Sequence, residues 1–151
     1  MIKILFVCHG NICRSPMAEF VMRDMAQKNG CDVYVASAAT STEEIGNPVH
    51  YGTRRKLEQV GISSSGKVAV QMTKKDYSKY DYIIGMDSAN IRNILRITGG
   101  DPEGKVAKLL SFAGDSGDIA DPWYTGNFEA TYRDVLKGCR GLLGEIEKKE
   151  A

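Results

Sequence analysis

The chain has 151 residues, of which 42% are hydrophobic, and this is enough to bury the core of one domain, so a single domain spanning residues 1–151 is expected. Its formal net charge is only +1, which excludes the large basic field typical of proteins that bind nucleic acid or anionic membranes. The first apolar run is too short for a signal peptide, and no apolar segment is long enough to span a membrane. Four irregularly spaced cysteines suit a reducing compartment. A cytoplasmic location is therefore expected.

The first third of the chain predicts a strand, a loop, a helix and a second strand. Ile2–Val7 contains one lysine and is otherwise apolar, as expected for a strand that is buried on both faces. Pro16 suits the first position of a helix, apolar residues then recur at helical spacing, and Gly30 can end that helix. Val33–Ser37 predicts the second strand, and the polar segment Ala38–Asn47 predicts a loop.

The rest of the chain continues this alternation. A helix is expected over about 48–61, and Thr73–Asp76 resembles a capping box on a short helix. Two further strands are expected at Asp81–Met86 and Lys105–Leu110, with Asp87–Ser88 as a candidate helix start between them. The last helix is the clearest, because apolar residues recur every three or four positions: Phe128, Tyr132, Val135, Cys139, Leu142 and Ile146.

Strands that alternate with helices predict βαβ units, and therefore an α/β fold with a four-stranded parallel sheet and helices on both faces. Ligands bind at the carboxyl ends of the strands in such sheets. The loop after the first strand and the polar loop Ser111–Asp121 after the fourth are thus expected at the same edge of the sheet.

The loop after the first strand carries a pattern of reactive residues. Cys8 and Arg14 form a C-x5-R motif, which is weak evidence when taken alone. Its context is specific, since a buried strand precedes it and Ser15–Pro16 begins a helix directly after it. Gly10 and Asn11 tolerate the unusual φ values that a tight loop requires.

Such a loop can turn successive backbone N–H groups inward, and with a helix N-terminus behind them they form an anion-binding site. Arg14 adds a planar, two-pronged group that matches phosphate oxygens. Cys8 lies at the bottom of this positive site, which favours the nucleophilic thiolate, and Ser15 can donate a hydrogen bond to it. The loop therefore predicts attack of a cysteine on a phosphoryl group.

That reaction needs an acid to protonate the leaving oxygen, and the late loop, "DIADPWYTGN", offers one in Asp121. Pro122 follows and stiffens the loop. Trp123 and Tyr124 come next and are suitable walls for a planar aromatic substrate.

The segments "VCHGNICRSPMAE" and "DPWY", together with "SAATS", "EIGNP" and "MDSAN", resemble the low-molecular-weight protein tyrosine phosphatase family over essentially the whole chain. The resemblance implies a flavodoxin-like three-layer fold and hydrolysis of phosphotyrosine in a protein or peptide, with no metal or organic cofactor. It also implies Cys8 as nucleophile, Arg14 as phosphate clamp and Asp121 as general acid and then base. Asn11 would hold the shape of the loop, and Ser15 would support the thiolate.

The same resemblance implies that substrate, free phosphate or another oxyanion binds in the loop. The implied substrate-binding residues are His9, Gly10, Asn11, Ile12, Cys13, Ser15, Trp123 and Tyr124. Cys13 resembles the family's second loop cysteine, which can form a reversible disulfide with the nucleophile; a simple packing role is the alternative. His50 is interpreted as a surface helix residue, and Asp87 as either a helix cap or a support for the loop.

Three features depart from the family pattern and bear on substrate preference: Glu43 in the loop after the second strand, Lys67–Gln71 in place of a histidine-x-alanine-arginine-glutamine segment, and Trp123 where tyrosine is usual. A phosphoarginine phosphatase of the same fold is the first alternative, and an inactive phosphotyrosine-binding module is the second. A thiol-based arsenate reductase would need a further cysteine pair, which is missing between Gly61 and Gly114.

Overall fold

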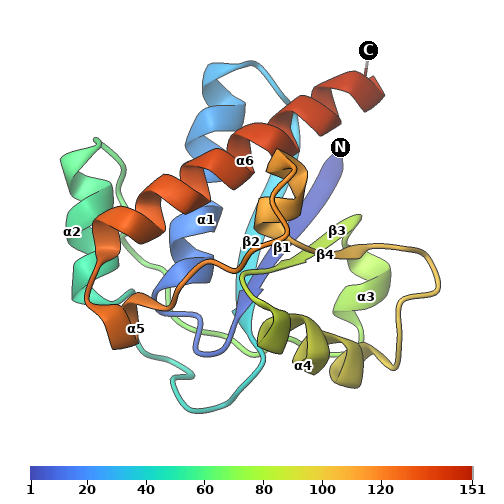
Figure 1. The fold of residues 1–151 in the computed structure, drawn as a ribbon, viewed down its shortest axis with the longest axis horizontal. Helices are drawn as coiled ribbons and strands as arrows, with labels where there is room; N and C mark the ends of the chain where they lie inside the picture. The colour runs from blue at the N-terminus through green and yellow to red at the C-terminus, as the bar shows by residue number, and fades with distance from the viewer. Residues whose placement is uncertain (151) are drawn as a thin grey trace.

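The computed structural model describes residues 1–150, and within them the chain forms a parallel sheet of four strands with helices on both faces (Figure 1). The strands are β1 (Ile2–Cys8), β2 (Val33–Ala39), β3 (Tyr82–Gly85) and β4 (Val106–Lys108), in the spatial order β2-β1-β3-β4. The helices are α1 (Arg14–Lys28), α2 (Tyr51–Gln59), α3 (Asp76–Lys79), α4 (Ser88–Thr98), the 3-10 helix η1 (Leu109–Ala113), α5 (Pro122–Thr125) and α6 (Phe128–Glu150). This strand order is the flavodoxin-like one, so the predicted fold is confirmed.

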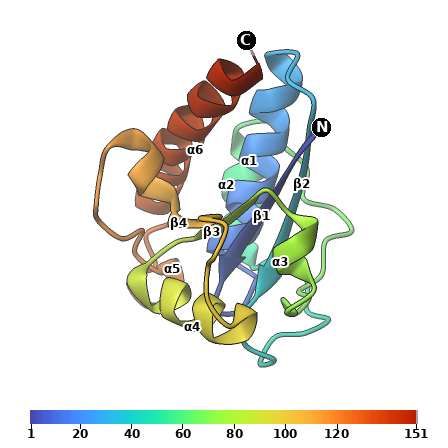
Figure 2. The same cartoon turned by 90° about the vertical axis from the view of Figure 1, so that its right-hand side faces the viewer.

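The side chains of β1 alternate between two hydrophobic cores. Ile4 and Phe6 point into a core shared with α1, α2 and α6, while Leu5 and Val7 point into a smaller one shared with α3 and α4. Figure 2 shows α1 and α6 on one side of the sheet and α4 on the other. Burial on both faces explains why this strand is a nearly continuous apolar run.

The fourth strand is shorter than Lys105–Leu110, and that prediction was wrong at its end. Leu109 and Leu110 are buried as expected, but they belong to η1, which packs against α6 (Figure 1). Close packing is possible because α6 carries glycine where η1 crosses it: a Cβ atom on Gly141 would collide with the backbone of Phe112.

Smaller differences concern helix ends. The first helix begins at Arg14, two residues before the expected Pro16, and the short helix α5 was not predicted. The capping box at Thr73 is only half formed, because the Asp76 carboxylate accepts the Thr73 N–H but no Thr73 side-chain cap is present. Asp87 does cap α4, in a full capping box with Asn90. Nowhere in residues 1–150 is a helix both long and apolar enough to cross a membrane.

Candidate active site

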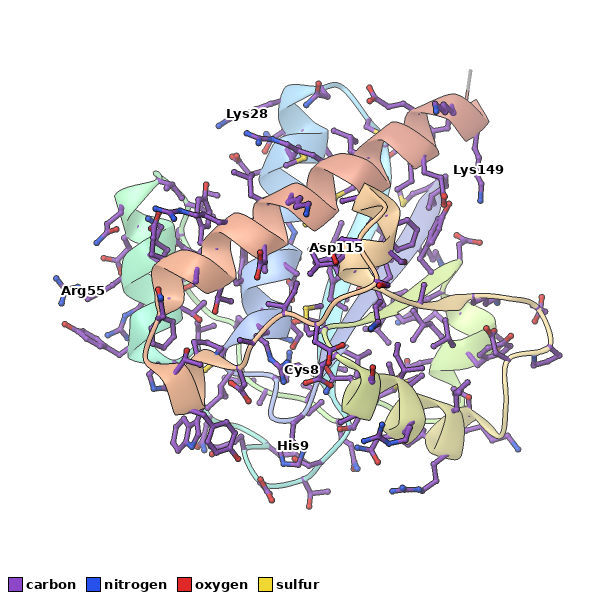
Figure 3. The ribbon with its side chains drawn as sticks, in the orientation of Figure 1. Cys8, His9, Lys28, Arg55, Asp115 and Lys149 are labelled. Carbon is purple, nitrogen blue, oxygen red and sulfur yellow. The ribbon has the colours of Figure 1, made fainter. Side chains whose placement is uncertain are left out.

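The first loop joins the C-terminal end of β1, at Cys8, to the start of α1, at Arg14 (Figure 3). Asn11 has φ 58°, and it is the one non-glycine residue with positive φ within residues 1–150. This left-handed residue reverses the chain over a short distance. Among the hydrogen bonds formed by the described residues, none uses the backbone N–H of Gly10, Ile12 or Cys13, so these donors are available for an anion.

Two groups contact the Cys8 sulfur, one from the loop and one from the first turn of α1. The Ser15 hydroxyl lies 3.0 Å from Cys8 Sγ, and the backbone N–H of Asn11 donates to the same sulfur at 3.3 Å. Asn11 Nδ2 donates to Ser15 Oγ at 2.8 Å, so the hydroxyl hydrogen of Ser15 is free to point at the sulfur. The sulfur is thus surrounded by donors, which suits a thiolate.

Asn11 is 1% exposed, and its amide links the loop to two distant segments. Besides its bond to Ser15, Nδ2 donates to Ser37 Oγ in β2 at 2.9 Å, and Oδ1 accepts the Val70 N–H at 3.1 Å. The Asn11 amide thus links the loop to α1, to β2 and to the segment at Val70, and its role in holding the loop's shape stays a prediction. Ser37 opens the segment "SAATS" and Val70 lies in Lys67–Gln71, but nothing in the sequence indicated that either contacts Asn11, because both are far from it in the chain.

A buried carboxylate lies behind this amide. The Ser37 hydroxyl donates to Glu19 Oε1 at 2.5 Å, and Glu19 is also paired with Arg23 and, at 3.8 Å, with Lys67. Burial lowers the pKa of the Lys67 ammonium, an effect that Glu19 partly opposes. Lys67 Nζ also donates to the Ser37 carbonyl at 2.9 Å, so the substituted segment at Lys67 has a structural partner in β2.

Arg14 is 3% exposed and is held by three acceptors. One guanidinium nitrogen donates to Asp87 Oδ2 at 2.7 Å and to the Ile119 carbonyl at 2.9 Å, and the other lies 3.5 Å from Asp121 Oδ2. Burial opposes the charge of Arg14, but the anionic form of Cys8 and the carboxylates of Asp87 and Asp121 outweigh it and raise its pKa. Arg14 is therefore a fixed cation beside the loop.

Asp121 comes from the late loop and faces Arg14, as the topology predicted. It is the N-cap of α5, where Oδ1 accepts the Trp123 N–H at 3.0 Å. Pro122 occupies the first turn of that helix, which fixes the chain direction immediately after the acid. The other carboxylate oxygen, Oδ2, is the one that lies 3.5 Å from Arg14.

A pocket of about 120 Å³ opens above Cys8. Its lining residues are Cys8, His9, Gly10, Ile12, Cys13, Arg14, Glu43, Glu44, Asp121, Trp123 and Tyr124. The structure thus brings together nine of the predicted site residues around one cavity, while Asn11 and Ser15 lie behind it.

The rim of this pocket is aromatic on one side and acidic on the other. Trp123 and Tyr124 are 57% and 84% exposed, and the Trp123 ring lies edge-on to His50 at 5.6 Å. On the acidic side, His9 Nε2 and Glu43 Oε2 are 2.8 Å apart, which joins the first loop to the loop after β2. Figure 3 shows His9 at the lower edge of the molecule, below Cys8.

Cys13 lines the pocket but is almost fully buried. Burial, followed by the negative charges of Cys8 and Asp121, raises the pKa of its thiol to about 12. Its carbonyl accepts a hydrogen bond from buried Thr53 in α2 at 3.1 Å.

His50 was wrongly interpreted as a surface helix residue. It is the half-buried N-cap of α2, its Nδ1 accepts the Gly52 N–H at 3.0 Å, and its own N–H donates to the Ile12 carbonyl at 2.8 Å. Its ring also stacks on Phe128 at 5.2 Å. His50 therefore connects the first loop to the starts of α2 and α6, a role that no local sequence signal showed.

Known proteins match this chain over its whole length. The family described as low molecular weight phosphotyrosine protein phosphatase matches residues 3–151. The low molecular weight protein-tyrosine-phosphatase YfkJ of Bacillus subtilis is 43% identical over 154 residues, with 99% of both chains covered. The corresponding enzyme PtpA of Staphylococcus epidermidis is 41% identical over 150 residues, with 98% of this chain and 96% of the relative covered.

Solved structures agree with these matches. The crystal structure of YfkJ superposes with a TM-score of 0.96 at 42% identity, covering 100% of this chain and 98% of that one. The crystal structure of a Drosophila arginine phosphatase gives a TM-score of 0.88 at 29% identity, covering 95% of this chain and 97% of that one.

Proposed function

Since this chain belongs to the low molecular weight phosphotyrosine protein phosphatase family and is a protein tyrosine phosphatase, we propose that Cys8, Arg14 and Asp121 carry out its reaction through a cysteinyl-phosphate intermediate. The observation that carries the proposal is their convergence: a sulfur surrounded by donors, a buried guanidinium and a carboxylate line one small pocket.

In the first step, the phosphoryl group of the substrate binds the free N–H groups of the loop and the guanidinium of Arg14. The Cys8 thiolate attacks phosphorus, so that a P–S bond forms as the bond to the phenolic oxygen breaks. Asp121, protonated at this stage, gives its proton to that oxygen and neutralises the leaving group.

In the second step, Asp121 is a carboxylate and accepts a proton from a water molecule that attacks phosphorus. The P–S bond breaks, inorganic phosphate is released, and Cys8 returns to the thiolate that the Ser15 hydroxyl and the Asn11 N–H stabilise. Asp121 ends the cycle protonated, ready for the next substrate. Asp121, the leaving oxygen and the attacking water are the only groups that give or take a proton in these two steps.

The pocket supports phosphotyrosine as the preferred substrate over phosphoarginine. Ile12 offers apolar surface, and Trp123 and Tyr124 offer aromatic surface, to a phenyl ring. A guanidinium would need a free carboxylate, but Glu43 is engaged by His9 at 2.8 Å, and Glu44, which also lines the pocket, accepts a hydrogen bond from Asn47 Nδ2 at 2.6 Å. Phosphoserine is expected to be a poor substrate because its short side chain does not reach Cys8.

Matched peptides carrying phosphotyrosine, phosphoarginine or phosphoserine test this preference through kcat/KM. The variants Ile12→Thr and Glu43→Ala are measured alongside. A wild-type preference for phosphoarginine would overturn the assignment. A shift towards phosphoarginine in Ile12→Thr would show that the Ile12 side chain favours phosphotyrosine over phosphoarginine.

We place the enzyme in the cytoplasm, with phosphotyrosine proteins as partners and neither nucleic acid nor a membrane among them. The balanced net charge of +1 supports this assignment. Free phosphate or a similar oxyanion is proposed to occupy the loop as product or inhibitor, held by the same N–H groups and by Arg14.

The variant Cys8→Ser tests the covalent mechanism directly. Turnover of p-nitrophenyl phosphate should be abolished, while phosphate still binds in titration calorimetry, because the anion site consists of backbone N–H groups and Arg14. Cys31→Ser is the matched control, since Cys31 lies outside the pocket and should leave turnover unchanged. Substantial activity in Cys8→Ser would rule out a cysteinyl-phosphate.

A further inference from the structure

In the loop that carries Asp121, the carboxylate of Asp118 contacts both β4 and the start of α4. Asp118 Oδ1 lies 3.0 Å from Lys108 Nζ at the end of β4, and it accepts the Ser88 N–H at 3.1 Å and the Ser88 hydroxyl at 3.3 Å. Lys108 Nζ donates in addition to the Ser116 carbonyl at 2.6 Å. A single carboxylate thus ties the loop to β4 and to the first turn of α4.

The next residue continues the attachment. Ile119 is fully buried, its N–H donates to the Met86 carbonyl at 2.9 Å, and its carbonyl accepts from Arg14 at 2.9 Å. Only Ala120 separates this fixed segment from Asp121. The attachments at Asp118 and Ile119 therefore both lie within three residues of Asp121.

Two adjacent residues at the start of α4 hold the two halves of the site. Asp87 accepts the hydrogen bond from Arg14 at 2.7 Å, and Ser88 donates to Asp118. The start of this helix therefore sets where the phosphate clamp and the acid loop lie relative to each other.

We infer that Asp118, held by Lys108 and Ser88, is a positioning residue that places Asp121 for proton transfer to the leaving group. The inference rests on the proposed role of Asp121 as general acid. A general acid acts only within hydrogen-bond reach of the oxygen it protonates. Displacement of a catalytic group by about 1 Å can cost on the order of 10²-fold in rate. Loss of an attachment three residues from Asp121 can therefore lower the rate by shifting the Asp121 carboxylate.

The charge state of Asp118 agrees with this role. The hydrogen bond from Lys108 is the largest cause of a lowered pKa for Asp118, with burial opposing it and Ser88 adding to it. The lowered pKa favours the ionised carboxylate, which is the form that accepts hydrogen bonds from both Lys108 and Ser88.

The same loop contains a matched control. Asp115 is paired with Lys137 of α6 at 3.0 Å and lies six residues before Asp121, twice as far along the chain as Asp118. Figure 3 places Asp115 beside α6, away from Cys8. If any ion pair in the loop affected catalysis merely by stabilising the fold, Lys137→Met and Lys108→Met would behave alike.

The test measures kcat/KM for wild type, Asp118→Asn, Lys108→Met and Lys137→Met on a series of aryl phosphates with leaving groups of increasing pKa. This parameter reports steps up to transfer of the phosphoryl group to Cys8 and so isolates the proton donation. We expect Asp118→Asn and Lys108→Met to lose about 10-fold on phenyl phosphate and much less on p-nitrophenyl phosphate, as partial misplacement of a general acid predicts.

The inhibition constant of inorganic phosphate should stay within a factor of about 2 in these variants, because Asp87 still holds Arg14. Lys108→Arg should restore most of the loss, and Lys137→Met should match the wild type. Equal losses on all leaving groups, or identical behaviour of Lys108→Met and Lys137→Met, would overturn the inference.

Asp121→Ala separates this inference from the proposal it rests on. A strong leaving-group dependence in Asp121→Ala together with none in Asp118→Asn would leave the acid assignment intact and reject the positioning role. No leaving-group dependence in Asp121→Ala would reject both. Urea unfolding of each variant verifies that the compared proteins are folded. If Asp118→Asn does not fold, Lys108→Met tests the same attachment.

Discussion

Replacing Asn11 by alanine tests whether this one side chain sets the geometry of the phosphate loop. The amide makes three hydrogen bonds in a site where Asn11 is 1% exposed, at 2.8, 2.9 and 3.1 Å. Each contributes about 1 kcal/mol to stability, so their loss costs about 3 kcal/mol. Alanine must also hold φ near 58° without a local amide contact, which costs about 1–2 kcal/mol. The expected loss for Asn11→Ala is therefore about 4–5 kcal/mol.

The variant Asn11→Gly separates the loss of the hydrogen bonds from the backbone strain at positive φ. Glycine loses the same three hydrogen bonds but adopts a positive φ without strain, at the expense of about 0.4–1 kcal/mol of extra freedom in the unfolded chain. The glycine variant should therefore be more stable than the alanine variant by up to about 1.6 kcal/mol. Equilibrium urea unfolding with unchanged m-values measures both differences.

The affinity of the same two variants for phosphate tests the effect of Asn11 on the binding site. Without its bonds to Ser37 and Val70, the loop no longer holds its N–H groups in one orientation, so the Kd for phosphate in titration calorimetry should rise in both variants. An alanine variant within about 1 kcal/mol of the wild type that also binds phosphate normally would refute the reasoning, because the loop would then be shaped by other residues.

Three further predictions follow from the site and the packing. Arg14→Lys should lose about 10²-fold or more in kcat/KM on p-nitrophenyl phosphate, because a point charge cannot reproduce a two-pronged contact with phosphate; full activity would exclude a clamp. Peroxide should oxidise Cys8 and give a reversible disulfide with Cys13, whose thiol has a pKa of about 12 and is not itself the reactive group. Cys13→Ser should then regain less activity with dithiothreitol than the wild type, and equal recovery would deny a protective role. Gly141→Ala should destabilise the protein by about 1–3 kcal/mol through its clash with η1, while Gly144→Ala, which meets no atom within 4 Å, should stabilise it by up to about 1 kcal/mol in urea unfolding.

The parts of the fold and the site that the sequence predicted are those whose signals lie close together in the chain. Cys8, Arg14 and Ser15 fall within eight consecutive residues, at the end of β1 and the start of α1, and both of these elements follow from local sequence patterns. The end of the fourth strand was misassigned because Leu109 is apolar and buried in either conformation. Gly141 of α6, about thirty residues later, leaves the room in which η1 packs, and no local pattern reports such a contact.

The same reasoning explains which supporting residues were missed. Ser37 and Val70 position Asn11 through hydrogen bonds formed only after the chain has folded, across separations of 26 and 59 residues. A serine in a strand and a valine in a loop have ordinary structural roles in most proteins. Their function here depends on the partner that the topology supplies, so composition and spacing could not identify them.

Asp87 both caps a helix and contacts Arg14, so the two interpretations offered for it do not exclude each other. Its Oδ1 accepts the Asn90 N–H at 2.7 Å and caps α4, while its Oδ2 accepts from Arg14 at 2.7 Å. A carboxylate has two oxygens, so one residue satisfies both interpretations that the sequence left open. Because the cap fixes the carboxylate on the helix, the helix in turn fixes Arg14, and the adjacent Ser88 fixes the loop of Asp121. The stability of the first turn of α4 and the alignment of the catalytic groups are therefore coupled, and a substitution at Asp87 must weaken both.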